Sequence, residues 1–255
     1  MPGPRYVYQR AYGEAKTPRR GASDLQECGD MAGSTTARNG GAPGEAEAVA
    51  RIVGALGYAL LRVFQLSAQA SASAPTLALR ERQAAFAVEE FERYQVLRRR
   101  LGALTDDPEK AMGQFRVALD AFFDGAPTAA WLDAQVFQYI GDAISTDFAD
   151  LIAPHLDEKT AAAVREGLSG RAAHEAFALE QIHRAISSDP DAETRVTAVT
   201  GAIVGNALGG LREAILTSDA LAVVLGGEEL VKEVVLELLG RHRERLERLG
   251  LDRVD

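Results

Sequence analysis

Apolar residues recur every three or four positions in long segments of this chain, and this spacing constrains the fold more than any other feature. Around Glu90, for example, Phe86, Tyr94 and Leu97 fall on one stripe of a helix, because side chains at such spacings share a helix face. Alternation typical of strands is scarce, whereas helix-favouring Ala, Leu, Arg and Glu are abundant. The chain is therefore predicted to be all-α, with main helices over residues 45–71, 75–104, 128–153, 157–187, 191–217 and 219–249.

The connection between the second and third predicted helices, residues 105–130, holds only a short amphipathic piece. Antiparallel neighbours usually need a loop of about 2–8 residues. A connection this long can instead carry the chain back along a whole bundle, as the single crossover of ferritin-like bundles does. We therefore predict a ferritin-like four-helix bundle with a long crossover, followed by a C-terminal helical hairpin.

Residues 1–44 differ from the rest in being rich in Gly, Pro, Ser, Thr and Arg and nearly free of large aliphatic side chains. Such a segment buries too little apolar surface to offset the entropy of ordering. We predict that it is disordered and that residues 45–255 form the ferritin-like helical domain. Met31 suggests the hypothesis that translation starts there. A basic arm for nucleic acid is less favoured, because Glu14 and Asp24 interrupt the arginines.

The composition also bears on location and partners. Cys28 is the single cysteine, which excludes an intramolecular disulfide framework and suits a reducing compartment. There is neither a run of about 18 apolar residues nor the apolar core of a secretory signal. We therefore predict a cytoplasmic protein without a membrane segment. The net charge of -9 argues against a broad nucleic-acid surface and leaves a local basic patch open.

Glu90 lies on the apolar stripe of its helix, where a lone charge is costly unless it is paired, protonated or bound to metal. Ferritin-like di-iron proteins place one Glu on each of two helices and a Glu-x-x-His pair on each of the other two. Acids and one His on the next two predicted helices are compatible with part of such a site. Periodicity places Glu175 on the inward face of its helix and the adjacent His174 to one side of that face. The candidate ligands for iron are Glu90, Asp142, Asp147, His174 and Glu175.

Other residues at expected ligand positions point to a different structure. The middle of the first helix has no acid near Ala59, Arg93 stands where a Glu-x-x-His motif would place His, and Arg171 precedes His174 by three positions. A guanidinium at a ligand position removes the need for a cation. The alternative is that Glu90 pairs with Arg93 or Arg171, so that a buried ion cluster replaces the metal and the protein is a non-catalytic scaffold or interaction protein.

Several short sequence motifs occur in the same order, over about 200 residues, as in the actinobacterial ferritin-like proteins similar to tRNA hydroxylases of the MiaE type, which this chain resembles. The matching motifs are Glu90-Phe91-x-x-Tyr94, Asp107-Pro108-Glu109-x-Ala111-Met112, Leu119-Asp120-Ala121-Phe122, Trp131-Leu132, Tyr139-Ile140-Gly141-Asp142-x-Ile144-x-x-Asp147-Phe148 and His174-x-x-Phe177-Ala178. The resemblance implies a ferritin-like bundle. In the true hydroxylases it implies a non-haem di-iron centre that hydroxylates a prenylated tRNA adenosine with dioxygen. Glu90, Asp142 and His174 fall on positions that resemble family ligands.

Two surfaces bear on partners. For tRNA, the predicted basic surface combines Arg98-Arg99-Arg100 with arginines of the last helix: Arg241, Arg243, Arg245 and Arg248. Solvated helix faces with Glu237–Arg241 and Glu244–Arg248 pairs are the alternative, and the favoured one. For helix packing, the small-residue series Gly201, Gly205, Gly209 and Gly210 predicts a close approach, either within the chain or across a homodimer.

Overall fold

The computed structural model describes residues 43–249, and within this range it is helical with no strand, which confirms the predicted all-α class. The predictions of disorder over residues 1–44 and of a start at Met31 concern mainly residues 1–42, which lie outside the described range. The elements are α1 (Pro43–Ser73), α2 (Leu77–Leu104), α3 (Pro108–Gly113), α4 (Arg116–Asp124), α5 (Trp131–Ile152), the 3-10 turn η1 (Ala153–His155), α6 (Glu158–Leu168), α7 (Ala172–Ser188), α8 (Ala192–Thr217), α9 (Ala220–Leu225) and α10 (Glu228–Leu249).

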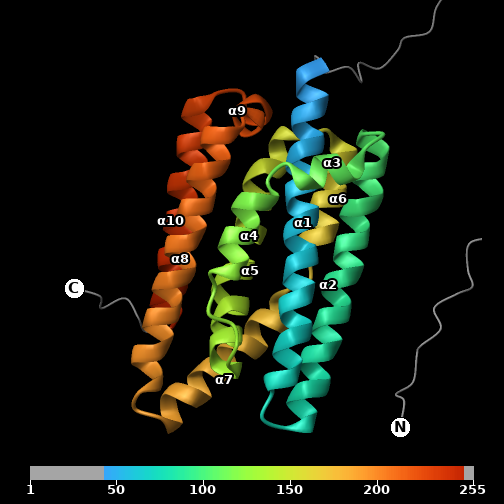
Figure 1. Cartoon of the computed structure of the whole chain (residues 1–255). Coiled ribbons are helices and arrows are strands. Elements are labelled where there is room, and N and C mark those ends of the chain that lie inside the picture. The colour runs from blue at the N-terminus through green and yellow to red at the C-terminus, as the bar shows by residue number, and fades with distance from the viewer. Residues whose placement is uncertain (1–42, 250–255) are drawn as a thin grey trace, which may run out of the picture. The chain divides into compact units, whose positions relative to one another are not determined.

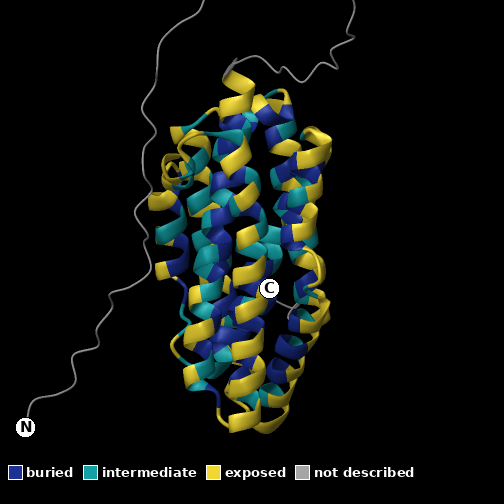
Figure 2. Cartoon of the chain, turned by 90° about the vertical axis from the view of Figure 1, so that its right-hand side faces the viewer, coloured by how far each residue is buried: buried dark blue, intermediate teal, exposed yellow. Residues whose placement is uncertain are grey.

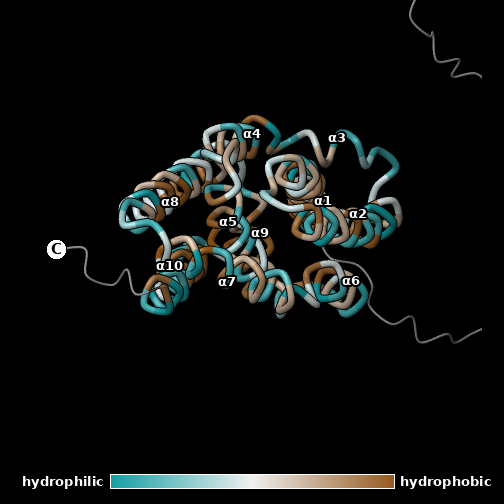
Figure 3. The backbone as a smooth tube through the Cα atoms, turned by 90° about the horizontal axis from the view of Figure 1, so that it is seen from below, coloured by the Kyte–Doolittle hydropathy of each residue, from teal (hydrophilic) through white to brown (hydrophobic). Residues whose placement is uncertain are grey.

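A four-helix bundle forms the centre of this part of the chain, made of α1, α2, α5 and the consecutive pair α6 and α7 (Figures 1 and 3). α1 packs along α2, α2 contacts α6, and α5 contacts both α1 and α7. Between α2 and α5, the short helices α3 and α4 follow α1 and carry the chain from one end of the bundle to the other. This is the predicted long crossover, and it gives the bundle its ferritin-like connectivity.

The C-terminal helices form the predicted hairpin, but its two long arms make their main contacts elsewhere. α8 packs against α4 and α5, whereas α10 packs against α5 and the short α9 that precedes it. Figure 3, which views the bundle end-on, places both arms on the side of α5 that faces away from α2. The hairpin thus forms a second layer over α5.

Two of the predicted helices are interrupted by glycines with positive φ. The predicted helix 157–187 is divided into α6 and α7 by a turn at Gly170, whose φ is 74°. The predicted helix 219–249 is divided into α9 and α10 at Gly226 and Gly227, with φ of 89° and 148°. Only glycine adopts such backbone angles readily, and a continuous apolar stripe concealed both breaks.

α3 crosses α1 at very short range. A Cβ atom built on Gly54 would lie 2.7 Å from the carbonyl carbon and oxygen of Ala111. Because backbone atoms cannot yield as a flexible side chain can, only glycine permits this crossing. Asp107 supports the start of α3 by accepting a hydrogen bond from the backbone N–H of Lys110, as an N-cap residue does.

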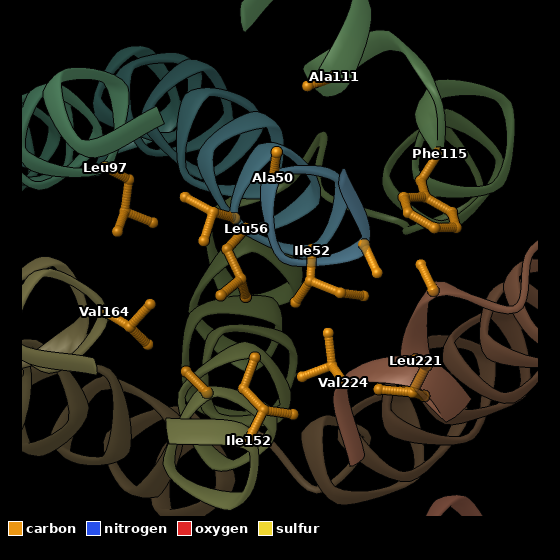
Figure 4. Close-up of a cluster of buried hydrophobic side chains, with 14 of the residues drawn as sticks. Ala50, Ile52, Leu56, Leu97, Ala111, Phe115, Ile152, Val164, Leu221 and Val224 are labelled. Carbon is orange, nitrogen blue, oxygen red and sulfur yellow. The ribbon is translucent and has the colours of Figure 1, made fainter. Parts of the chain in front are cut away.

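The buried apolar residues fall into two clusters, one toward each end of the bundle. The first joins α1, α2, α3, α5, α6, α9 and α10 and includes Ile52, Leu97, Ile152 and Val164 (Figure 4). The second joins α1, α4, α5, α7, α8 and the end of α10 and includes the aromatic residue Phe137. Figure 2 shows exposed residues on the outer helix faces and buried residues between the helices.

α1 is the one helix within residues 43–249 that is long and apolar enough to cross a membrane. In the structure 56% of its apolar window is buried inside the bundle, and core helices of soluble proteins satisfy the same criterion. We therefore assign α1 to the core of the bundle.

The glycine series of α8 packs less than its spacing predicts. A Cβ atom added at Gly201, Gly205 or Gly209 would have nothing within 4 Å, and only Gly210 meets another helix, at 3.3 Å from the carbonyl oxygen of Ala118. The prediction of a close approach along the whole series within the chain is therefore wrong, because α4 contacts α8 on a neighbouring face. The prediction of a homodimer stays a prediction.

Candidate functional site

Glu90 lies in the middle of α2 with only 1% of its surface exposed. It stands between Phe86 and Leu97 on the buried face of that helix, so the inward position predicted from the apolar stripe is confirmed. A carboxylate so deeply buried requires partners, because desolvation strongly disfavours an isolated charge.

The partners of Glu90 are two arginine side chains. Arg93, one turn further along α2, donates from Nη1 to Oε1 across 2.7 Å, and Arg171, just before α7, donates from Nη2 to Oε2 across 2.5 Å. Both arginine side chains are about nine-tenths buried, with 11% and 10% exposed. Each oxygen of Glu90 is therefore held by a separate guanidinium, as the alternative of an ion cluster predicts.

Arg93 also fixes the turn between α6 and α7. Its Nε donates to the carbonyl oxygen of Ser169 and its Nη2 to that of Gly170, both across 3.1 Å. The positive φ of Gly170 shapes this turn. The same guanidinium thus joins the centre of α2 to the turn between α6 and α7, the pair that forms the fourth member of the bundle.

The charge of Glu90 is stabilised despite its burial. Burial favours the protonated form, but the charge of Arg171, the hydrogen bond with His174 and the charge of Arg93 outweigh it, and they hold the pKa of Glu90 below its usual value. Glu90 is therefore an anion at neutral pH.

Asp142, on α5, faces the same cluster but is less well paired. Its Oδ1 lies 3.8 Å from Nη1 of Arg171 and has no hydrogen-bond partner in the described part of the chain, whereas its backbone carbonyl accepts from that Nη1 across 3.3 Å. Burial raises the pKa of Asp142 to about 7, although the charge of Arg171 opposes the shift. Asp142 is the weakly compensated member of the cluster.

His174, in the first turn of α7, completes the cluster. Its Nδ1 lies 3.3 Å from Oε1 of Glu90, and its Nε2 lies 3.0 Å from Oε2 of Glu89, whose side chain is 48% exposed. The imidazole packs on Phe86, with the ring centroids 3.8 Å apart. His174 thus connects the buried carboxylate to one at the surface.

Glu175 and Asp147 lie outside this cluster. Glu175 is half-buried and faces α10, where Nη1 of Arg248 lies 3.4 Å from its carboxylate, so the prediction that Glu175 rather than His174 points inward is wrong. The reason is that the buried face of α7 runs through His174, Phe177, Ala178 and Gln181, so that Glu175 lies at its edge. Asp147 is buried against α10, where it accepts from both terminal nitrogens of Arg245. Of the five candidate ligands, the structure brings together Glu90, Asp142 and His174.

A polar network two turns along the same face of α2 was missed from the sequence. Gln83, which is fully buried, donates from Nε2 to Oγ of Ser67 across 2.8 Å and accepts at Oε1 from Nε2 of Gln135 across 3.1 Å. The seven-residue spacing from Gln83 to Glu90 is the signal that could have placed Gln83 inside, because such spacing keeps two residues on one face.

The fold implies iron as a cofactor, but the residues at the centre of the bundle do not fit a di-iron centre. Within residues 43–249, no group of three or more His, Cys, Asp or Glu side chains is arranged to hold a metal ion. Both oxygens of Glu90 accept from guanidinium groups, which supply the positive charge that iron would bring. On α1 the expected Glu is replaced by Ala59, which packs in the second apolar cluster.

Most arginines of the predicted basic surface pair with carboxylates of other helices. Arg100 pairs with Asp157, the N-cap residue of α6, at 3.2 Å. Arg241 and Arg245 pair with Asp147, and Arg241 also bonds Glu237 at 3.0 Å as predicted. Arg248 pairs with Glu175 in place of the predicted Glu244. These contacts stabilise helix packing, and tRNA as a partner stays a prediction.

The bundle, its crossover and the acids at its centre define a ferritin-like helical protein. The family model for the ferritin-like domain of actinomycetes matches residues 44–228, and the chain belongs to this family. A search of curated proteins finds no match to the chain.

Proposed function

We propose that this chain is a non-catalytic ferritin-like scaffold or interaction protein in which an ion cluster of Glu90, Arg93 and Arg171, with His174 and Asp142 beside it, takes the place of a metal centre. The observation that carries the proposal is the guanidinium donor on each oxygen of Glu90.

The energetics of exchange support this proposal. Iron that replaced Arg93 and Arg171 at Glu90 would leave both guanidinium groups largely buried without their carboxylate, and iron that bound beside them would meet their positive charge. Leaving one buried charge unpaired costs about 3–5 kcal/mol. Arginine stays charged at every accessible pH, so a change of pH does not release the site for metal.

The cluster has a structural role that needs no reaction. It links α2 to the turn between α6 and α7 through Arg93, and to α5 through the contact of Arg171 with the backbone of Asp142. It therefore fixes the positions of α2, α5 and the pair α6 and α7 relative to one another.

A di-iron hydroxylase of the MiaE type, with tRNA as its substrate, is the second candidate. It is favoured by the convergence of Glu90, Asp142 and His174 on one cluster. It requires these side chains to bind iron after both arginines have moved away, and it predicts about two irons per chain, as in other di-iron bundles.

Equilibrium dialysis against ferrous iron under anaerobic conditions, followed by metal analysis and measurement of dioxygen uptake, separates the two candidates. The scaffold predicts no stoichiometric iron, and equal traces in the wild type, Glu90→Gln and the surface control Glu92→Gln. About two irons per chain that are lost in Glu90→Gln alone, with dioxygen uptake, would overturn the scaffold and support the hydroxylase.

A further inference from the structure

A cavity of about 200 Å³ separates the C-terminal hairpin from the bundle. α1, α4, α5, α8, α9 and α10 all contribute to its walls. Protein interiors rarely contain voids larger than a water molecule, and an engineered apolar cavity of about 150 Å³ is large enough to bind benzene. The space is therefore sufficient for an organic molecule of roughly eight non-hydrogen atoms, in proportion to that example.

The cavity lies between the two apolar clusters of the core. Ile52, Phe115 and Leu221 of the first cluster line one part of it, and Ala59 and Phe122 of the second cluster line another. In Figure 4, Ile52, Phe115 and Leu221 come from separate segments and face a common space. The arms α8 and α10 each pack mainly on other helices, so they do not close this space by packing on each other.

Small side chains keep the cavity open, and apolar side chains surround its opening. Ala207, Gly210 and Ala214 line it from α8. Leu208 of α8 and Leu239 of α10 also line it, although they are 43% and 39% exposed. The seam between the two arms therefore gives an apolar ligand a route from solvent.

The lining is almost entirely apolar, and among the residues that the structure describes no charged side chain contributes to it. Its polar members are Ser145, Ser218 and His242. Nδ1 of His242 is buried and has no hydrogen-bond partner among residues 43–249, which is unusual for a buried polar atom. Burial, together with the charge of Arg245, lowers the pKa of His242 although Asp147 opposes the shift. A neutral imidazole offers one hydrogen bond to a neutral molecule, whereas a charged ligand would be desolvated without a counter-charge.

We infer that this cavity is a binding site for a small, uncharged apolar molecule with one hydrogen-bonding group, such as a phenol or an alcohol, which pairs with the imidazole of His242. This ligand fills the apolar space and presents its polar group to the imidazole that lines it. The inference is independent of the metal question, because none of the five residues of the ion cluster lines the cavity.

The matched probes are p-cresol and p-xylene, which have the same shape and differ by one hydroxyl group. Calorimetric titration of the full chain is expected to show saturable binding of both at one site, with p-cresol about tenfold tighter, as one hydrogen bond allows. His242→Phe should remove this preference and retain binding of p-xylene.

Filling the cavity tests its position. Ala207→Leu and, independently, Ala214→Leu place extra carbon atoms in the space. Each should lower the affinity for both probes at least tenfold, a loss comparable with the free energy of burying one apolar side chain. Ala202→Leu, on an exposed face of the same helix, should change affinity less than about twofold. Circular dichroism checks that each variant is folded.

The following results would overturn the inference or a part of it. Failure of the wild type to bind either probe would do so, as would binding that both filling variants leave unchanged. Absence of binding in a chain that elutes as a dimer would assign the exposed apolar residues of α8 and α10 to a second copy. Equal affinity for the two probes, unaltered by His242→Phe, would overturn the role of His242.

Discussion

Nη2 of Arg171 lies 2.5 Å from Oε2 of Glu90, although the two residues are far apart in the sequence. The contact crosses the bundle from the start of α7 to the middle of α2, where ferritin-like di-iron proteins place metal ligands. Since Arg93 holds the other oxygen of the same carboxylate, the positive charge at this position comes from the protein. This arrangement is the basis of the proposed loss of metal chemistry.

Removing the central carboxylate should strongly destabilise the fold. In Glu90→Gln, Arg93 and Arg171 lose their shared anion while they remain about nine-tenths buried, and the free energy of unfolding should fall by about 3 kcal/mol. Glu92→Gln on the exposed face of α2 should change it by less than about 0.5 kcal/mol. Urea denaturation at neutral pH measures the free energy of unfolding of both variants, and an equally small decrease in the two would contradict the ion cluster.

Asp142 should make stability decrease as pH rises. Its folded pKa of about 7 lies above the unfolded value of about 3.9, so between these values the folded protein holds a proton that the unfolded chain has released. The free energy of unfolding therefore declines through this window. Asp142→Asn should remove the decline and be more stable than the wild type by about 2 kcal/mol at pH 8.

Urea denaturation of the wild type and Asp142→Asn at several values between about pH 5 and pH 8 tests the sign of this effect. Glu90 stays ionised across the window because its pKa is lowered. Parallel curves for the two proteins would contradict the assignment to Asp142.

Two glycines of α1 should respond oppositely to the same substitution. A Cβ at Gly54 would lie 2.7 Å from backbone atoms of Ala111, so Gly54→Ala should cost about 2 kcal/mol through overpacking. At Gly57 the nearest atom is Cβ of Leu97 at 3.9 Å, so Gly57→Ala should gain about 0.7 kcal/mol from helix propensity. Thermal denaturation compares them, and similar melting temperatures would mean that α3 does not cross α1 this closely.

The pair of Asp147 and Arg245 should hold α10 on α5. Asp147→Asn leaves Arg245, which is 9% exposed, without its anion, so stability should fall by about 3 kcal/mol. Amide hydrogens of α10 should then exchange faster than those of α2. Asp150→Asn is the matched control, because Asp150 is 58% exposed and 3.9 Å from Arg241. Unchanged exchange in Asp147→Asn would contradict this role.

The main helices could be predicted because apolar spacing reports burial directly, and the crossover because its connection is too long for antiparallel neighbours. Glu90 was placed inside by the same reasoning, and the structure confirms it. The glycine turns at Gly170 and Gly226 could not be placed this way, because the apolar stripe continues across each break while the backbone changes direction. The roles of His174 and Glu175 were exchanged for another reason, because the buried face of α7 is rotated by one position from the predicted apolar stripe.

The composition of the cluster was open from sequence alone, because Glu90 has the same helical position whether it meets iron or arginine. Whether Glu90 pairs with arginine depends on where Arg171 lies, and the turn at Gly170 sets that position. The cavity beside His242 was not predicted at all. It arises from how α8 and α10 sit on α5, and helix periodicity contains no information about the separation of two helices.

Anomalous diffraction at the iron edge, from crystals soaked anaerobically in ferrous iron, tests the central claim most directly. We predict no anomalous peak within bonding distance of Glu90, with the guanidinium groups of Arg93 and Arg171 on its two oxygens as in the present structure. One or two strong peaks beside Glu90, Asp142 and His174, with both arginines turned away, would contradict the claim and restore a metal centre to this bundle.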